Sequence, residues 1–201
     1  GEFHGINTSI LDQIGKTILS KNFDYKTFKL IIDKKRFQKY LLEKYDNFKN
    51  KLYLDKSLEN FFNIKIILEF FPNAKFIHTY RNFNDAVIGI YMTMLPKLSW
   101  SHKIENIINY INLYKKTINF FKEKYPTKII DVELSKLSNN KQEETKKILN
   151  FCNIKFNNNY LDFDTNNNLA NKTNSFLQVR KKITKYEDNK YKPYYDLLNK
   201  Y

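Results

Sequence analysis

Short apolar runs alternate along this chain with longer amphipathic segments, and this alternation limits the possible folds more than any other feature of the sequence. Three of these runs, KLYLD (51–55), KFIHTY (75–80) and KIIDVEL (128–134), predict strands. The segments between and around them are too long for hairpin turns, so the strands are predicted to be parallel and the fold class α/β. Apolar residues at helical spacing predict helices over 8–19, 25–45, 59–71, 84–94, 104–125, 141–152 and 193–198.

The length of 201 residues fits one domain with a single core. We expect residues 1–50 to be helical, 51–152 to form a strand-helix core and 153–201 to be rich in loops. The lone Cys152 excludes an internal disulfide and suits a reducing compartment, so a cytoplasmic location is expected. No apolar run approaches the roughly 18 residues of a membrane span, and no signal-peptide pattern opens the chain. The sequence does not set the oligomeric state.

The net charge of +14 raises the question of a nucleic-acid partner. The lysines are dispersed along every predicted helix and accompany many Asn, Ile, Tyr and Phe residues, a bias typical of AT-rich codons. We therefore expect no nucleic-acid partner, although such a charge would still steer a small anionic ligand. His4, His78 and His102 show no metal-ligand spacing, so no metal site is expected, and His78 is interpreted as a strand residue.

Charged residues stand where predicted strands end, and this is the edge at which open α/β sheets bind ligands. Lys56 follows the first strand, Arg81 the second, and Glu133 closes the third. A guanidinium beside the N-terminus of a helix is a good phosphate clamp, and Asn82 or Asn84 could cap that helix. Alternatively, Arg81 forms only an (i, i+4) ion pair with Asp85. The spacing favours neither interpretation.

Four ordered segments resemble the sulfotransferase family that uses 3′-phosphoadenosine 5′-phosphosulfate (PAPS), in particular its bacterial branch similar to tyrosylprotein sulfotransferases. The segments are LDKSLENFFNI (54–64), FPNAKFIHTYRNFNDAVIGIY (71–91), KIIDVELSKLSNNKQEETKKILNFC (128–152) and TNSFLQVRKKI (173–183). The resemblance implies a three-layer P-loop-type fold, with a parallel sheet flanked by helices. It also implies transfer of a sulfonate group from PAPS to an acceptor hydroxyl, without a metal.

Residue by residue, the resemblance implies that Arg81 binds the 3′-phosphate of PAPS, assisted by Gln178 and Arg180. Gly89 stands where the family has a serine that joins this arginine at the phosphate. A tryptophan usual in the C-terminal segment is replaced by Tyr191.

The resemblance also assigns catalytic roles. Lys56 would lie at the bridging or sulfonate oxygens and stabilise charge on the leaving group. Ser175 would contact the sulfonate region, and Glu2 would be the general base on the acceptor hydroxyl. Such an arrangement suits a transfer that needs an in-line acceptor, a base and a cation.

The family's 5′-phosphosulfate loop has no counterpart among these residues, since none of the four glycines lies in a phosphate-loop setting. We therefore expect a chain truncated at its N-terminus, active only together with that loop. Two alternatives remain open: a divergent sulfotransferase-like domain that binds without catalysing, and an unrelated basic α/β protein that binds nucleic acid or a nucleotide. A peptide, a carbohydrate or a small molecule could be the acceptor.

Overall fold

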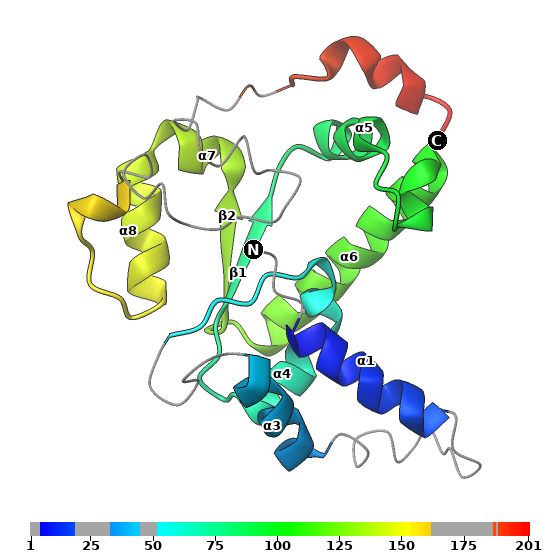
Figure 1. Cartoon of the computed structure of the whole chain (residues 1–201). Coiled ribbons are helices and arrows are strands. Elements are labelled where there is room, and N and C mark those ends of the chain that lie inside the picture. The colour runs from blue at the N-terminus through cyan, green and yellow to red at the C-terminus, as the bar shows by residue number, and fades with distance from the viewer. Residues whose placement is uncertain (1–4, 19–32, 45–51, 162–186, 188) are drawn as a thin grey trace. The chain divides into compact units, whose positions relative to one another are not determined.

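The computed structural model describes residues 5–18, 33–44, 52–161, 187 and 189–201 (Figure 1). The chain divides into two compact units. The first comprises Gly1–Ala74 and Ala170–Asn174, and the second comprises Lys75–Leu169 and Ser175–Tyr201. Each unit is described below by itself.

The described elements of the first unit are all helices. They are α1 (Gly5–Ile18), α3 (Lys34–Lys44), the 3₁₀-helix η3 (Leu58–Phe62) and α4 (Ile64–Phe70). Asp33 begins α3, because its Oδ1 accepts a hydrogen bond from the Lys35 amide at 2.8 Å. The side chain of Gln13 in α1 accepts from the Asp33 amide at 2.9 Å and so ties the start of α3 to α1.

One core cluster of the first unit is built around the buried side chains of Ile10 and Phe37. The ring of Phe37 stacks on Phe70 with 4.7 Å between centroids and is tilted against Phe71 at 5.9 Å. Aromatic contacts of this kind add to the free energy gained by burying the rings. They hold α3 and α4 together.

The strand predicted at 51–55 is wrong in its described part, because residues 52–57 join no sheet. A strand needs a neighbour to satisfy its backbone groups, and this segment is held by a side chain instead. Oδ2 of Asp55 accepts from the Ile6 amide at 3.4 Å, and Oδ1 accepts from Nδ2 of Asn60 at 2.6 Å. The segment is therefore extended without being a strand.

The helix predicted over 59–71 exists but is divided at Asn63 into η3 and α4. Asn63 is buried, and its Nδ2 donates to Oδ1 of Asn7 at 3.1 Å. The segment is not buried on every side, because 44% of Phe62 is exposed.

The second unit contains two parallel strands, β1 (Phe76–Tyr80) and β2 (Ile129–Glu133), and confirms the predicted orientation. Their register pairs Phe76 with Ile129 and Tyr80 with Glu133, so both strands end at the same edge. In Figure 1, α6 (Ile104–Lys124) lies beside β1 and α8 (Lys141–Phe151) lies beside β2. The helix α7 (Leu134–Asn139), which begins directly after β2, was not predicted. Its six residues are too few to show a helical period.

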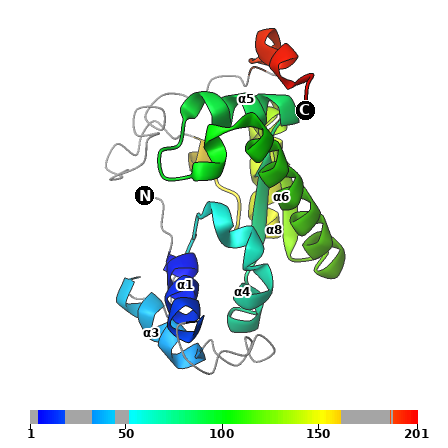
Figure 2. The ribbon, with the colours of Figure 1, turned by 90° about the vertical axis from the view of Figure 1, so that its right-hand side faces the viewer.

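The helix α5 (Phe83–Thr93) follows β1 and packs on α6. Their shared core consists of Val87, Ile107 and Ile111, with Leu198 packed against it. Leu198 belongs to the 3₁₀-helix η7 (Lys192–Leu198), which lies beside α5 (Figure 2). Two further 3₁₀-helices, η4 (Ser99–His102) and η5 (Asn158–Leu161), complete the described elements.

Candidate functional site at the end of strand β1

The connection from β1 to α5 places an arginine at the edge where both strands end. Arg81 follows the last residue of β1, and Asn82 is the N-cap of α5. Oδ1 of Asn82 accepts from the Asp85 amide at 3.1 Å, which confirms Asn82 as one of the two predicted caps. The first amides of any α-helix lack intrahelical acceptors, so this turn carries partial positive charge beside Arg81.

Arg81 and Gly89 lie in direct contact. A Cβ atom added to Gly89 would overlap Nη2 of Arg81 and would lie 3.3 Å from its Cζ. The same Cβ would lie 3.3 Å from Cε2 of Tyr191. In the part of the chain that the structure describes, the guanidinium of Arg81 makes no hydrogen bond and no ion pair. The glycine therefore leaves space that the arginine occupies.

The predicted alternative, an ion pair between Arg81 and Asp85, is wrong. Asp85 is fully buried, and its Oδ1 accepts from the Tyr191 amide at 3.1 Å and from the Tyr195 hydroxyl at 2.8 Å. Its Oδ2 is buried and has no hydrogen-bond partner. Asp85 therefore binds the C-terminal segment rather than Arg81. We call Arg81, Asp85, Gly89 and Tyr191 the Arg81 corner.

Side chains at the same sheet edge link the two strand ends. The Tyr80 hydroxyl donates to Oε2 of Glu133 at 3.4 Å, Ser135 donates to Oε1 at 2.7 Å, and Lys136 lies 3.2 Å from Oε2. The hydrogen bonds from Ser135 and Lys136 hold the pKa of Glu133 below its ordinary value. Partial burial and the charge of Glu133 raise the pKa of Tyr80. Glu133 is therefore ionised and anchored where it was expected.

A second group of polar side chains joins the middle of the sheet to α6. Nδ1 of His78 lies 2.6 Å from Oδ1 of Asp131, and Nε2 is hydrogen-bonded to the Tyr114 hydroxyl. Nζ of Lys122 donates to Oδ2 of Asp131 at 2.7 Å. Since a carboxylate only accepts, Nδ1 carries the imidazole proton and Nε2 accepts from Tyr114. We call these four residues the His78 cluster.

Burial lowers the pKa of His78, and the nearby charge of Lys122 adds to this effect. Partial burial alone would raise the pKa of Asp131, but hydrogen bonds from Lys122 and His78 outweigh it and lower that pKa. His78 is therefore a neutral strand residue at neutral pH, in agreement with its interpretation from the sequence.

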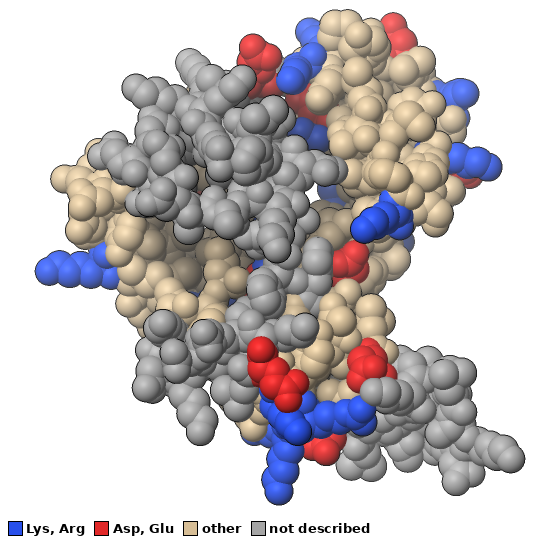
Figure 3. Space-filling model, viewed as in Figure 1, with Lys and Arg blue, Asp and Glu red and all other residues tan. Residues whose placement is uncertain are grey.

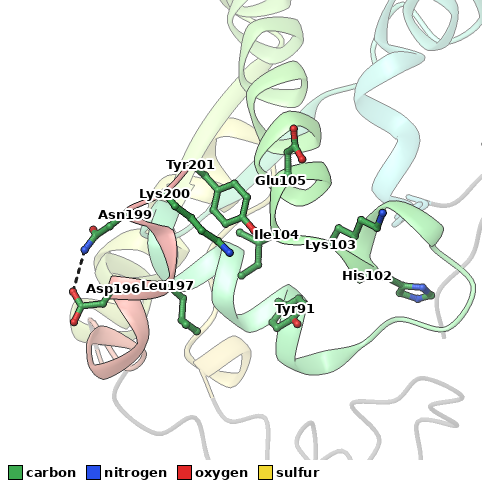
Figure 4. A pocket seen from close by; sticks show the side chains of 10 residues that line it. All are labelled: Tyr91, His102, Lys103, Ile104, Glu105, Asp196, Leu197, Asn199, Lys200 and Tyr201. Atoms are coloured by element: carbon green, nitrogen blue, oxygen red, sulfur yellow. Dashed lines mark hydrogen bonds between the residues drawn. The ribbon is translucent and has the colours of Figure 1, made fainter.

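A cavity of about 660 Å³ opens at the far end of α5 (Figure 4). Tyr91, Ile104, Leu197 and Tyr201 give it apolar walls, while charged side chains of both signs complete the lining. Tyr91 follows Gly89 of the Arg81 corner by two residues, and Asp196 and Leu197 directly follow Tyr195, the partner of Asp85.

The charges of the described residues are spread out. Figure 3 shows Lys and Arg side chains at separate places on the face in view, with Asp and Glu between them. Within the described residues no group of His, Cys, Asp and Glu could hold a metal ion. The described helices include none that is long and apolar enough to cross a membrane.

A model of the sulfotransferase family matches residues 17–158 of this chain. The chain belongs to the sulfotransferase family. A protein of Aquifex aeolicus (strain VF5) described as an uncharacterized protein is 26% identical over 145 residues, which is 70% of this chain. The chain spans 19% of the length of that relative. The matched range of the family includes Lys56, Arg81 and Gly89.

The predicted site residues of this sulfotransferase domain fall into three groups. Arg81 and Gly89 come together in the second unit, and Lys56 lies exposed in the first unit, directly after the anchored Asp55. The remaining four lie outside the described residues: Glu2, Ser175, Gln178 and Arg180.

Sequence reasoning missed the contribution of the C-terminal segment to the Arg81 corner. Tyr191 and Tyr195 contact Asp85 across 106 and 110 residues of sequence. No local pattern reports a contact of such long range. One signal was available in the sequence. Asp85 is the one charged residue in the otherwise largely apolar helix FNDAVIGIYMT (83–93), and a buried carboxylate needs hydrogen-bond donors from elsewhere in the chain.

Proposed function

We propose that this chain is part of a PAPS-dependent sulfotransferase of the branch similar to tyrosylprotein sulfotransferases, and that Arg81 holds the 3′-phosphate of PAPS. The observation that supports this most directly is the state of Arg81. The backbone of Arg81 lies at the ligand edge of a parallel sheet, directly before the N-cap of α5, and its guanidinium contacts Gly89 and has no hydrogen-bond or ion-pair partner among the described residues. A planar guanidinium matches the geometry of a phosphate and can bind two of its oxygens.

The remaining predicted residues complete the proposed chemistry. Glu2 accepts the proton of the acceptor hydroxyl, whose oxygen then forms a bond to sulfur. The bond between sulfur and the bridging oxygen of PAPS breaks, and 3′-phosphoadenosine 5′-phosphate (PAP) leaves. Lys56 stabilises the negative charge on the departing phosphate, and Ser175 binds a sulfonate oxygen. Gln178 and Arg180 support Arg81 at the 3′-phosphate.

The proposed domain is a P-loop-type sulfotransferase domain formed by residues 1–201 together with a 5′-phosphosulfate loop. No glycine of this chain provides such a loop. We therefore propose activity for a polypeptide that contains both these residues and the loop, and only weak binding of PAPS by the 201 residues alone. The acceptor carries a hydroxyl group on a peptide, a carbohydrate or a small molecule.

A first experiment tests the role of Arg81 on the 201-residue chain. Adenosine 3′-monophosphate should bind more tightly than adenosine 5′-monophosphate, as measured by NMR titration. Arg81→Ala should remove this preference, with a loss of about tenfold or more because charge-assisted hydrogen bonds to the phosphate disappear. Arg36→Ala is the matched control, because Arg36 forms only an exposed pair with Asp12 at 3.8 Å. Equal affinity for both nucleotides would contradict the assignment.

A second experiment tests catalysis on a polypeptide that includes the 5′-phosphosulfate loop. PAP should raise its melting temperature, and labelled PAPS should transfer sulfonate to one of the three acceptor classes. Lys56→Ala should lower kcat more than it raises KM for PAPS, since its role concerns the leaving group. Stabilisation by PAP without turnover of any acceptor would favour the binding domain that does not catalyse. The absence of stabilisation would overturn the sulfotransferase proposal.

A further inference from the structure

Burying the carboxylate of Asp85 costs free energy unless hydrogen-bond donors replace the water that it loses. Its side chain is 0% exposed, and a buried carboxylate loses favourable hydration that its partners must replace. Only Oδ1 has such partners, the Tyr191 amide and the Tyr195 hydroxyl, and both come from the C-terminal segment. Oδ2 remains buried without a partner. The carboxylate is therefore committed to one contact, the attachment of the segment around η7 to α5.

This attachment brings Tyr191 to the place where Arg81 lies. Asp85 and Gly89 are four residues apart and lie on one side of α5, whereas Arg81 stands before the N-cap of this helix. Both the ring of Tyr191 and the guanidinium of Arg81 lie close to Gly89. A Cβ atom added to Gly89 would lie 3.3 Å from the Tyr191 ring and would overlap Arg81. The Arg81 guanidinium therefore lies against Gly89, and the Tyr191 ring lies against the same glycine.

We propose that Asp85 is a positioning residue: by fixing Tyr191 and Tyr195 against α5, it closes the Arg81 corner and sets where the Arg81 guanidinium lies. This inference rests on the proposed function for its relevance to PAPS, but the positioning itself is a property of the free chain. Asp85 makes no contact with a substrate in this scheme. It acts through Tyr191.

The same arrangement gives Gly89 a role opposite to that expected from the resemblance. The family has a serine at this position, which suggests that Gly89 merely lacks a hydroxyl donor. In this structure a serine Cβ would displace the end of the Arg81 side chain. Gly89→Ser and Gly89→Ala should therefore both shift the Arg81 guanidinium, and a difference in their affinity for a 3′-phosphate would report the added hydroxyl alone.

The arginine content of the chain makes the position of Arg81 directly measurable. Arg36, Arg81 and Arg180 are its three arginines, so their side-chain Nε–H signals can be assigned with single Lys variants. In the wild-type chain the ¹H–¹⁵N heteronuclear NOE of Arg81 Nε should be high, near that of rigid backbone amides, and well above that of the exposed Arg36. An Arg81 signal as mobile as that of Arg36 in the wild-type chain would overturn the proposal.

Four variants then test the role of the C-terminal segment. Tyr195→Phe removes the hydroxyl donor to Asp85, and it should lower the Arg81 NOE and weaken binding of adenosine 3′-monophosphate about tenfold. Tyr194→Phe is the matched control, because Tyr194 is 48% exposed in the same short helix, and it should change neither measurement. Asp85→Ala should act like Tyr195→Phe. Asp85→Asn should largely restore both measurements, because its amide oxygen still accepts from Tyr191 and Tyr195.

The two measurements separate failure of the positioning proposal from failure of the proposed function. If Tyr195→Phe loosens Arg81 while the wild-type chain does not prefer the 3′-nucleotide, the function fails and the positioning holds. If the wild-type chain binds the 3′-nucleotide through Arg81 but Tyr195→Phe behaves like Tyr194→Phe, the positioning is wrong and the function holds. A shift in melting temperature alone, with an unchanged Arg81 NOE, would reduce Asp85 to a structural residue and overturn the proposal.

Discussion

The Arg81 corner and the His78 cluster lie in the same unit, yet their polar groups are arranged in opposite ways. In the His78 cluster both oxygens of Asp131 and both ring nitrogens of His78 have hydrogen-bond partners. In the Arg81 corner the guanidinium has no partner among the described residues, and one oxygen of Asp85 is buried without one. Satisfied groups stabilise the fold, whereas the guanidinium of Arg81 has donors left for a ligand. We therefore expect mutations in the two groups to affect different measurements.

The largest effect on stability should come from Asp131→Ala. This change leaves Nδ1–H of His78 and the ammonium of Lys122 without their acceptor, and it should lower the free energy of unfolding by about 1–2 kcal/mol. The value is moderate because 46% of the Asp131 side chain is exposed, so water replaces part of the lost interaction. Urea unfolding measures it. Binding of adenosine 3′-monophosphate should not change, and a weakened affinity would break the distinction between the two groups.

Tyr114→Phe should have a smaller effect of the same kind. It removes the hydroxyl that donates to Nε2 of His78 but keeps the ring, which lies 5.4 Å from the His78 ring between centroids. The expected loss is about 1 kcal/mol in the free energy of unfolding, the usual contribution of one neutral hydrogen bond. An unchanged free energy of unfolding in Tyr114→Phe would show that this hydrogen bond does not stabilise the fold.

The acid dependence of stability should report His78. Burial holds the pKa of His78 below its ordinary value of 6.5, so below that pH the unfolded chain binds a proton at this position more readily than the folded chain. The free energy of unfolding should therefore fall as the pH drops below 6.5 toward the lowered pKa of the folded state. His78→Gln should flatten this part of the curve. An identical slope in the variant would show that His78 does not titrate in this way.

The smallest effects on stability should follow Arg81→Ala and its control Arg36→Ala. Neither change breaks a buried interaction, and each should alter the free energy of unfolding by no more than about 0.5 kcal/mol. Arg81→Ala should nevertheless abolish nucleotide preference, whereas Arg36→Ala should not. A destabilisation by Arg81→Ala as large as that by Asp131→Ala would mean that Arg81 has a structural role.

The sequence was sufficient where structure depends on neighbours along the chain. The two strands FIHTY and IIDVE, their parallel orientation and the cap at Asn82 all follow from local patterns and standard connection rules. The strand predicted at 51–55 failed because a strand also needs a partner, and Asp55 provided other hydrogen bonds for the segment. Local apolar content could not reveal this.

The candidate site was predictable only in part, for a related reason. Arg81 and Gly89 are eight residues apart, and the family motif indicated that they act together. The Tyr191 and Tyr195 contacts with Asp85 depend on how a distant segment returns to α5. A contact between residues more than one hundred positions apart produces no periodic pattern in the sequence of either segment, so the sequence could not predict it.

That long separation has a consequence for the order in which the domain is assembled. Bringing Tyr195 to Asp85 closes a loop of 110 residues, and for a flexible chain the entropic cost is about 4 kcal/mol. Two hydrogen bonds do not offset such a cost, so docking of η7 must draw on the packing of Leu198 against the core of α5 and α6. During synthesis the two strands and α5 emerge well before residue 195. Until then the Arg81 corner lacks Tyr191. The Arg81 corner is thus completed late in folding, by a segment that is synthesised about one hundred residues after Arg81.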